Sequence, residues 1–303
     1  MKIMSRLRRW RELYSQFSRF QDLYEEMKML VAKPLVEQVR AKHRIDALEE
    51  VEFKVFSQWG DDGIIQWLVN HLPIPDKTFI EFGVDDYREA NTRFLLMNDN
   101  WSGLIMDRSE KRIREIRSSD IFWKHDLSAR AVFLDRSNVD GSIASTFQGE
   151  IGLLHIDIDG NDYWLWQEIK AVQPIIVIIE YNSVFGSQRP ITIPYQEQFD
   201  RPSAHSSCLY YGASIPAFCH LAGQKGYAFI GCNVAGNNAY FVRRDKLNDA
   251  VREVSVAKGF RLSKFRDSRD AAGRMNYLAG EKRADAIRGM PVFNVVTERM
   301  EKF

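Results

Sequence analysis

Cysteine is scarce in this sequence of 303 residues, which contains only Cys208, Cys219 and Cys232. An odd number of cysteines without CxxC spacing argues against a disulfide framework and against a cysteine-based zinc site. The basic start of the chain, MKIMSRLRRW, is not followed by an apolar segment, so it does not resemble a secretory signal. We therefore expect a cytoplasmic protein in a reducing compartment.

The sequence also lacks an excess of charge and a long apolar run. Its 42 Lys and Arg balance 41 Asp and Glu, so the net charge of +1 gives no reason to expect a nucleic-acid partner. The most apolar short run, residues 175–179, is far below the roughly 20 residues that a membrane-spanning helix needs. With 45% hydrophobic residues, the composition is typical of a soluble globular protein.

Both ends of the chain are predicted to be extensions of a central domain. Residues 1–50 carry apolar side chains at spacings of three and four, as an amphipathic helix does, and we expect Pro34 to end that helix. Its first 20 residues contain six Lys and Arg against Glu12 alone, so the helix could lie on an anionic membrane surface. The alternatives are packing on the protein's own body or on a second subunit. Residues 246–303 have the composition of a helical and irregular appendage.

Residues 51–245 alternate short apolar runs with helical stretches, which is typical of an α/β domain. Continuous apolar runs such as LLHI and IIVII indicate strands of a parallel sheet that is covered on both faces. We predict a doubly wound, mostly parallel, seven-stranded Rossmann-like sheet whose last two strands form a hairpin around NVAGNN. The expected strands are Thr78–Val84, Gly103–Asp107, Ala131–Leu134, Ile151–Ile156, Pro174–Glu180, Tyr227–Cys232 and Ala239–Arg243.

Ligands of such sheets bind at the carboxyl ends of the strands. The first strand ends near Gly83, where the backbone can approach a ligand closely, but the segment lacks the GxGxxG spacing of a dinucleotide site. Asp85 and Asp86 follow and would repel a phosphate there, which further disfavours a dinucleotide cofactor. The second strand ends at Asp107, which either accepts hydrogen bonds from ribose hydroxyls or caps the next helix.

Acidic side chains gather after the fourth expected strand and at the end of the fifth. Asp157, Asp159 and Asp162 follow the fourth strand, and Glu180 and Asn182 point the same way at the end of the fifth. If the two strands are neighbours, all of these residues except Asp162 can converge into a site for Mg²⁺, which prefers oxygen ligands. The alternative is structural: Asp159 and Asp162 cap the following helix, and Glu180 pairs with an arginine.

Several segments between residues 53 and 245 form a pattern that is specific only in combination. They are FSQWGDDG at 56–63, EANTRFL at 89–95, WSGL at 101–104, LLHIDIDGNDYW at 153–164, IIVIIEYN at 175–182 and LYYGAS at 209–214. Together they resemble the class I S-adenosylmethionine-dependent methyltransferases. More narrowly, they resemble the FkbM-like family and its relatives associated with bacterial surface polysaccharides.

This resemblance implies S-adenosylmethionine as the cofactor, and a side chain added at Gly83 is expected to block its binding. The adenine-contacting acid would be Asp126 or Asp135, of which we favour Asp135 because a helix follows it. Where many relatives carry further glycines after Gly83, this chain has Asp85, Asp86 and Tyr87. The residues that the resemblance places at the cofactor are Glu81, Gly83, Asn91, Thr92, Asp107 and Asp157.

The implied reaction is methylation of a hydroxyl on a glycan or another small-molecule acceptor, which requires positioning and removal of a proton. Mg²⁺ would bind the hydroxyl and ease the loss of its proton. Without a metal, the base is expected to be Asp159, Asp162 or His205. Aromatic side chains after the strands either form a platform for a sugar ring or belong to the core: Trp164, Trp166, Tyr181, Phe185, Tyr195, Tyr210 and Tyr211.

Two other functions fit the same sequence. The replacement of loop glycines by Asp85 and Asp86 is compatible with a noncatalytic scaffold in polysaccharide assembly. The acidic cluster is compatible with a Mg²⁺-dependent hydrolase or transferase. For either end of the chain we expect a role in packing or assembly, with homo-oligomer formation or peripheral membrane contact through the N-terminal helix.

Overall fold

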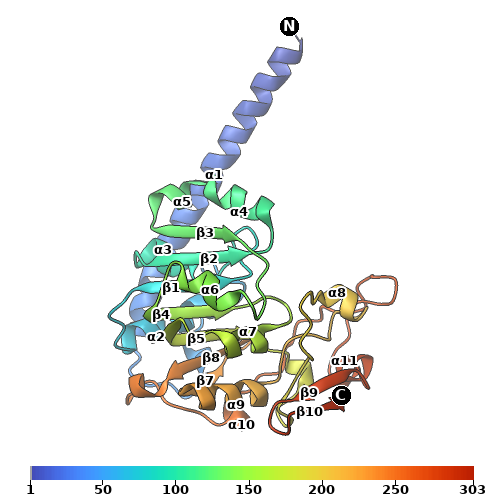
Figure 1. The fold of residues 1–303 in the computed structure, drawn as a ribbon. Coiled ribbons are helices and arrows are strands. Elements are labelled where there is room, and N and C mark those ends of the chain that lie inside the picture. The colour runs from blue at the N-terminus through green and yellow to red at the C-terminus, as the bar shows by residue number, and fades with distance from the viewer. Residues whose placement is uncertain (1) are drawn as a thin grey trace.

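A seven-stranded sheet forms the centre of the protein in the computed structural model (Figure 1), which describes residues 2–303 except for the side chains of residues 2–15, 17, 18 and 22. From one edge to the other, its strands are β3 (Leu127–Ala131), β2 (Ser102–Asp107), β1 (Thr78–Phe82), β4 (Gly149–Ile156), β5 (Val172–Glu180), β8 (Asn238–Arg243) and β7 (Tyr227–Cys232). The first five are parallel, and β8 is antiparallel to both of its neighbours. The doubly wound, mostly parallel sheet predicted from the sequence is therefore confirmed.

Helices cover both faces of this sheet, which explains why β4 and β5 are apolar along most of their length. On one face lie α2 (Asp61–His71), α3 (Arg93–Asn98), α4 (Glu110–Arg117) and α5 (Asp120–Lys124), in a cluster that includes Trp67 and Ile113. On the other face lie α6 (Val139–Ala144), α7 (Asp162–Glu168) and α9 (Ile215–Lys225), in a cluster that includes Trp166 and Phe218. Two hydrophobic cores, one per face, therefore hold the sheet in place.

The third strand lies earlier in the chain than the sequence analysis predicted. We expected Ala131–Leu134, but β3 spans Leu127–Ala131, and it pairs with β2 from Gly103 to Asp107. The prediction was wrong because β3 is an edge strand whose side chains alternate between buried and exposed, so its sequence LSARA is less apolar than the AVFL that follows. Residues 132–134 instead leave the sheet at its carboxyl edge.

A smaller lobe, formed by residues 183–213 and 261–303, lies on the side toward which the arrowheads of the parallel strands point (Figure 1). Its sheet contains β6 (Ile191–Thr192), β9 (Pro291–Asn294) and β10 (Arg299–Lys302), all paired antiparallel. The C-terminal segment, expected to be helical and irregular, thus also contains a β-hairpin. The remaining short elements are α8 (Arg201–Ala204), α10 (Val256–Gly259), α11 (Glu281–Ala286) and 3₁₀ turns at Leu48–Val51, Ser183–Phe185 and Arg244–Lys246.

The N-terminal helix α1 (Lys2–Arg40) projects beyond the sheet (Figure 1). The prediction that Pro34 ends this helix was wrong, because the helix continues through it to Arg40. Val36 and Val39 are buried against the body after the proline. Their burial stabilises the last turns of the helix and offsets the hydrogen bond that proline cannot donate.

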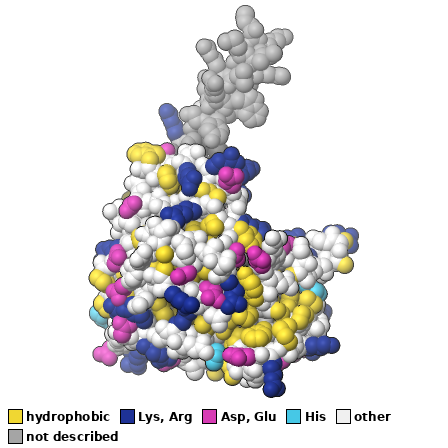
Figure 2. All heavy atoms as spheres, in the orientation of Figure 1, with side chains coloured by type: hydrophobic (Ala, Val, Ile, Leu, Met, Phe, Trp, Pro, Cys, Tyr) yellow, Lys and Arg dark blue, Asp and Glu magenta, His cyan; other side chains and the backbone are white. Residues whose placement is uncertain are grey.

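The surface of the described residues gives two further observations. No helix among them combines the length and the hydrophobicity that crossing a membrane requires. On the face shown in Figure 2, basic and acidic side chains are interspersed. The near-zero net charge therefore does not arise from two segregated patches on that face.

Gly83 occupies a position where the backbones of two loops touch. A Cβ atom at this residue would lie 1.7 Å from the carbonyl oxygen of Asp157, and the φ angle of Gly83 is +73°. The loops are this close because β1 and β4 are neighbours and both end at this edge of the sheet. A side chain at Gly83 would thus meet the protein's own backbone, which corrects the expectation that it would act by filling the cofactor's space.

We predict that Gly83→Ala destabilises the fold by about 3 kcal/mol or more, through backbone strain and overpacking together. Urea denaturation measures the effect. Gly141→Ala is the matched control, because a Cβ atom at Gly141 in α6 has no neighbour within 4 Å. That control should be neutral or stabilising by up to about 1 kcal/mol, and equal losses in both variants would contradict the prediction.

Candidate functional site

A cleft of about 710 Å³ opens at the carboxyl ends of the parallel strands, the edge where doubly wound sheets bind ligands. Its lining has three sources. The loop group consists of Gly83, Asp85, Met106–Ser109, Arg112 and Val132–Leu134. The lobe group consists of Phe199–Pro202, Phe265 and Asp267. The acidic group consists of Asp157, Asp159 and Glu180, and the remaining lining residues are Gln58, Trp59, Ile158, Asn161 and Asn237.

The loop after β1 folds as a glycine-rich loop does, although it contains only one glycine. Asp85 has a φ angle of 45° and Tyr87 one of 60°, so both adopt the left-handed conformation that glycine accepts most easily. The amide of Asp85 donates a hydrogen bond to Oδ2 of Asp107, 3.0 Å away. Side-chain contacts thus stabilise the turn in place of glycine's conformational freedom.

Arg112 compensates the negative charge of this loop. Its Nε lies 2.7 Å from Oδ1 of Asp85, and its Nη1 lies 4.0 Å from Oδ2 of Asp86. These carboxylates repel an anion less than the sequence suggested, because an arginine from α4 accompanies them in the cleft. The amide of Ser109 donates to Oδ1 of Asp107, which fixes the orientation of that carboxylate toward the loops.

Glu81 lies beneath the cleft and does not line it. Its carboxylate accepts hydrogen bonds from the amides of Asn91 and Thr92, at 2.9 and 3.1 Å, and contacts Nδ1 of His155 at 2.8 Å. Burial alone would raise the pKa of Glu81, but the contacts with His155 and Thr92 outweigh it and lower the pKa. Glu81, Asn91 and Thr92 therefore form a buried polar network, which corrects their prediction as residues that contact the cofactor.

Neither acid proposed for adenine contacts the cleft. Asp135 accepts hydrogen bonds from the amides of Ser137 and Asn138, so it caps the turn before α6. Asp126 precedes β3, at the amino ends of the parallel strands and therefore away from the cleft. Its carboxylate accepts a hydrogen bond from Oγ of Ser102 there. The displaced position of β3 explains the error, since it brings residues 132–134 to the cleft in their place.

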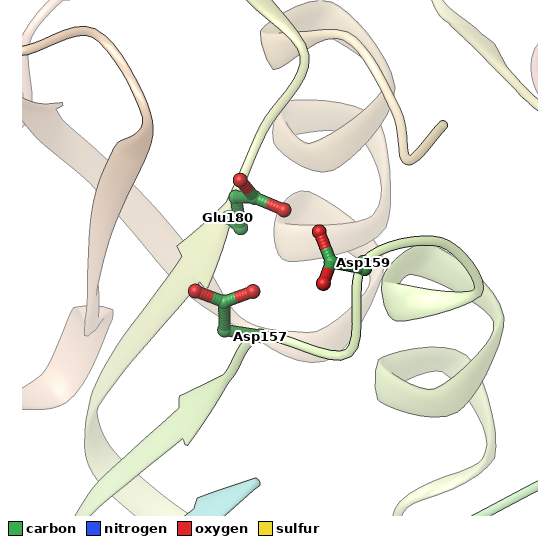
Figure 3. A group of neighbouring side chains, drawn as sticks. All are labelled: Asp157, Asp159 and Glu180. Atoms are coloured by element: carbon green, nitrogen blue, oxygen red, sulfur yellow. The ribbon is translucent and has the colours of Figure 1, made fainter. Parts of the chain in front are cut away.

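Asp157, Asp159 and Glu180 point toward one another at the ends of β4 and β5 (Figure 3), and one oxygen of each lies within 4.8 Å of the others. Burial, followed by repulsion from Asp159, raises the pKa of Asp157 to about 7. Burial and the nearby Asp157 raise the pKa of Glu180 well above its ordinary value. Oε2 of Glu180 is buried and has no hydrogen-bond partner among the described residues. The repulsion among the three carboxyl groups is therefore reduced by protons, by a neighbouring basic side chain or by a bound cation.

Arg201 is a residue of this site that the sequence analysis missed. Its Nη1 lies 2.6 Å from Oδ1 of Asp159, its Nε donates to the carbonyl oxygen of Cys208, and its guanidinium stacks on the ring of Tyr211 at 3.7 Å. Burial disfavours the charge on Arg201, but surrounding groups that include Glu180 and Asp159 outweigh it and raise the pKa. The proline after Arg201 signals a helix start, but nothing in the sequence links it to residues 157–159.

Three other predicted site residues have structural roles. Asp162 is fully buried and accepts hydrogen bonds from the amides of Ile158 and Gly160, so it shapes the loop and does not reach the cleft. Asn182 is buried, and its side-chain amide donates to the carbonyl oxygens of Leu209 and Tyr211 and is not turned toward the carboxylates. His205 bonds Ser207 outside the cleft lining. These findings correct Asp162 and His205 as bases and Asn182 as a metal ligand.

The aromatic surface of the cleft also differs from the predicted one. The predicted residues are largely core residues, and none of them lines the cleft. Trp59 and Phe265 line it instead, with stacked rings whose centroids lie 6.0 Å apart. The loop of Trp59 is held by Asp62, whose Oδ2 accepts hydrogen bonds from the amides of residues 55, 56 and 57. The DDG end of the FSQWGDDG segment thus positions a tryptophan at the cleft.

Comparison with known proteins adds the following. No protein-family model matches the chain, and the curated proteins contain no match. Among solved structures, it is similar to the N-terminal domain of EvdMO1 with SAH bound, at 11% identity and a TM-score of 0.34, over 55% of this chain and 72% of that one. It is also similar to an O-methyltransferase family protein from Burkholderia thailandensis, at 12% identity and a TM-score of 0.37, over 74% and 59%. The bifunctional kinase-methyltransferase WbdD matches at 14% identity and a TM-score of 0.33, over 55% of this chain and 34% of its own. Similarity at this level assigns no function.

We predict that Glu180→Gln stabilises the ligand-free protein at pH 8 by about 1–3 kcal/mol and that the gain shrinks toward pH 5. The folded-state pKa values of Asp157 and Glu180 are raised, so the folded protein binds more protons than the unfolded chain above about pH 4. Its stability therefore falls as pH rises toward these folded-state values, and the amide removes part of that loss.

Urea denaturation at both pH values measures this effect. The matched control is Glu197→Gln, since Glu197 is exposed and belongs to no described ion pair. It should change stability by no more than about 0.5 kcal/mol at either pH. A gain for Glu180→Gln that is as large at pH 5 as at pH 8 would show that repulsion among ionised carboxylates is not the cause.

Proposed function

We propose that the protein is an S-adenosylmethionine-dependent methyltransferase whose acceptor is a hydroxyl group of a glycan or glycoconjugate precursor. One observation carries the proposal: the Gly83 loop, Asp107 and the acidic group line the same cleft. This cleft lies at the point where the order of the strands reverses. This arrangement supplies a place for a nucleoside beside carboxyl groups that can accept a proton.

The loop group suits the nucleoside part of the cofactor. Asp107 keeps a lone pair on each oxygen after its two backbone hydrogen bonds, so it can accept hydrogen bonds from ribose hydroxyls. Residues 132–134 add apolar surface for a planar base. S-adenosylmethionine supplies an electrophilic methyl group when bound, and the roles of Gly83, Asp107 and Asp157 at the cofactor stay predictions.

The acidic group suits the proton transfer. With S-adenosylmethionine bound, the acceptor oxygen would take the methyl group from its sulfur atom, which would keep the electron pair of the broken carbon–sulfur bond. The hydroxyl proton passes to a carboxylate. Asp157 is suited to this task because its pKa of about 7 lies near neutral pH, whereas Asp159 is held by Arg201.

The same carboxylates also fit Mg²⁺. Three oxygen ligands within 4.8 Å and the partnerless Oε2 of Glu180 are the donor set that a hard cation prefers. Asp157, Asp159 and Glu180 would hold the ion, whereas Oδ1 of Asn182 accepts a hydrogen bond from the amide of Val184 at 3.0 Å, so we leave Asn182 out of the ligand set. A bound Mg²⁺ would make the acceptor hydroxyl more acidic.

The lobe group and Trp59 support a glycan acceptor. Trp59 and Phe265 present aromatic surface at the cleft, on which the apolar face of a sugar ring can lie. Asp267 and Asn161, which line the same cleft, offer hydrogen bonds to its hydroxyls. Oδ1 of Asn161 is buried without a partner among the described residues.

Calorimetric titration with S-adenosylmethionine, with and without Mg²⁺, tests the cofactor assignment. Asp107→Asn should weaken binding about 10-fold or more, because the ribose would lose a charge-assisted hydrogen bond. The matched control is Asp126→Asn at the opposite edge of the sheet, which should leave affinity within about twofold. An absence of binding by the unaltered protein would contradict the proposal and favour the noncatalytic scaffold.

Transfer of labelled methyl groups to a panel of glycosides, phenols and carboxylic acids tests the acceptor. Trp59→Ala should lower kcat/KM for a glycoside about 10-fold without changing the affinity for S-adenosylmethionine, since stacking surface is lost. Trp123→Ala, at an exposed tryptophan outside the cleft, is the matched control and should have no effect. Transfer to phenols alone would contradict a glycan acceptor.

The same assay in excess EDTA distinguishes carboxylates that bind Mg²⁺ from carboxylates that accept the proton directly. Loss of transfer in EDTA and in Asp159→Asn supports the metal. If transfer persists in EDTA while Asp159→Asn is inactive, Asp159 contacts the acceptor or its proton and the Mg²⁺ site is wrong.

A further inference from the structure

Helix α1 has two apolar faces, and among its described side chains only one of these faces is buried against the domain. The first face contacts the body: Ala32, Val36 and Val39 are buried there. Polar contacts reinforce it, because Nη2 of Arg93 lies 2.8 Å from Oε2 of Glu25 and Nζ of Lys28 donates to the carbonyl oxygen of Val55 at 2.9 Å. This face fixes the direction in which the helix leaves the domain.

The second face is exposed and consists of large side chains. Phe20 is 67% exposed and Met27 is 63% exposed, although both are apolar. Successive residues differ by 100° around a helix, so this face lies opposite the one that contacts the body. We call it the apolar stripe; its described residues are Phe20, Leu23, Tyr24, Met27, Leu30 and Val31.

The spacing of the stripe is that of helices that pair. Tyr24 and Val31 are seven residues apart, as are Phe20 and Met27, and the two series are offset by three or four. In the sequence, the same series continue through Trp10 and Phe17 and through Leu13. A seven-residue repeat of this kind is typical of helices that pack along their length against another helix.

The stripe cannot be covered by the domain that carries it, because the opposite face of the same helix is bound to that domain. An anionic membrane is a poor occupant of its described part, since residues 20–31 contain Asp22, Glu25 and Glu26 against Lys28 alone. Helices that lie on anionic lipid carry Lys and Arg beside their apolar face. A protein surface is therefore the better match.

We propose that the apolar stripe is the contact surface for the same helix of a second copy of this chain, with the two helices antiparallel. Residues 2–19 contain six basic residues and one acidic residue, whereas residues 20–31 contain three acidic residues and one basic residue. An antiparallel pair brings these oppositely charged halves together, whereas a parallel pair would place like charges side by side. The proposal is independent of the reaction in the cleft.

Sedimentation analysis of the full chain, over a range of concentrations, tests this proposal. The unaltered protein should have twice the mass of one chain. The double variant Phe20→Gln with Met27→Gln should raise the dissociation constant about 100-fold or more, because each copy loses two large apolar side chains from the contact. Glutamine is a good helix former, so the helix itself is retained.

The matched control places the same residue type elsewhere on the helix, outside the two charged halves, as Lys33→Gln with Glu37→Gln. Both positions are exposed and lie outside the stripe, so the dissociation constant should change by no more than about fivefold. Circular dichroism and urea denaturation check that every variant is folded. A single-chain mass for the unaltered protein, or equal weakening in both double variants, would overturn the proposal, as would a monomer that binds anionic vesicles through Phe20 and Met27.

Discussion

Backbone atoms of the loops after β1 and β4 meet at Gly83, because a residue without a side chain leaves the space that the carbonyl oxygen of Asp157 fills. The order of the strands reverses at this pair, so the chain leaves the sheet in opposite directions on either side of it. The cleft opens where the loops diverge. Because Gly83 has no side-chain carbon, the Asp85 loop and the acidic group can lie at the same candidate site.

Charge in this site is balanced between the two lobes of the protein. The carboxyl groups of Asp157, Asp159 and Glu180 belong to the large sheet, and Arg201, which pairs with Asp159, belongs to the smaller lobe. Removing such groups from water is costly unless opposite charge accompanies them. The ion pair therefore contributes to holding the smaller lobe against the carboxyl ends of the strands.

The sequence predicted the sheet well because buried parallel strands leave continuous apolar runs, as in β4 and β5. It misplaced β3, whose polar residues alternate at the sheet edge, and it ended α1 at Pro34 because the tertiary contacts of Val36 cannot be read from local pattern. In both cases the bounds of the element depend on contacts with residues that are distant in the sequence. Such contacts cannot be read from the local pattern of a single sequence.

For the site, three of the four residues predicted to converge do so, namely Asp157, Asp159 and Glu180, because strand ends at one edge follow from the fold. Asn182 instead bonds backbone groups. The sequence could not separate these acids from Asp162, which bonds the backbone of its own loop. Arg201 and Phe265 could not be found either, because Arg201 lies 42 residues after Asp159, its partner in the site, and Phe265 lies further along the chain. Site residues that come from distant segments of the chain can be identified only from the tertiary structure.

The origin of the cleft residues also bears on how such a protein can change. Phe265 and Asp267 come from the C-terminal segment, and Arg201 comes from the connection between β5 and α9, whereas Gly83 directly follows β1 and Asp107 is the last residue of β2. Insertions and substitutions in the first two segments leave the strand order and its loops untouched. Selectivity toward a new partner molecule can thus evolve by exchange of surface segments over an invariant central framework.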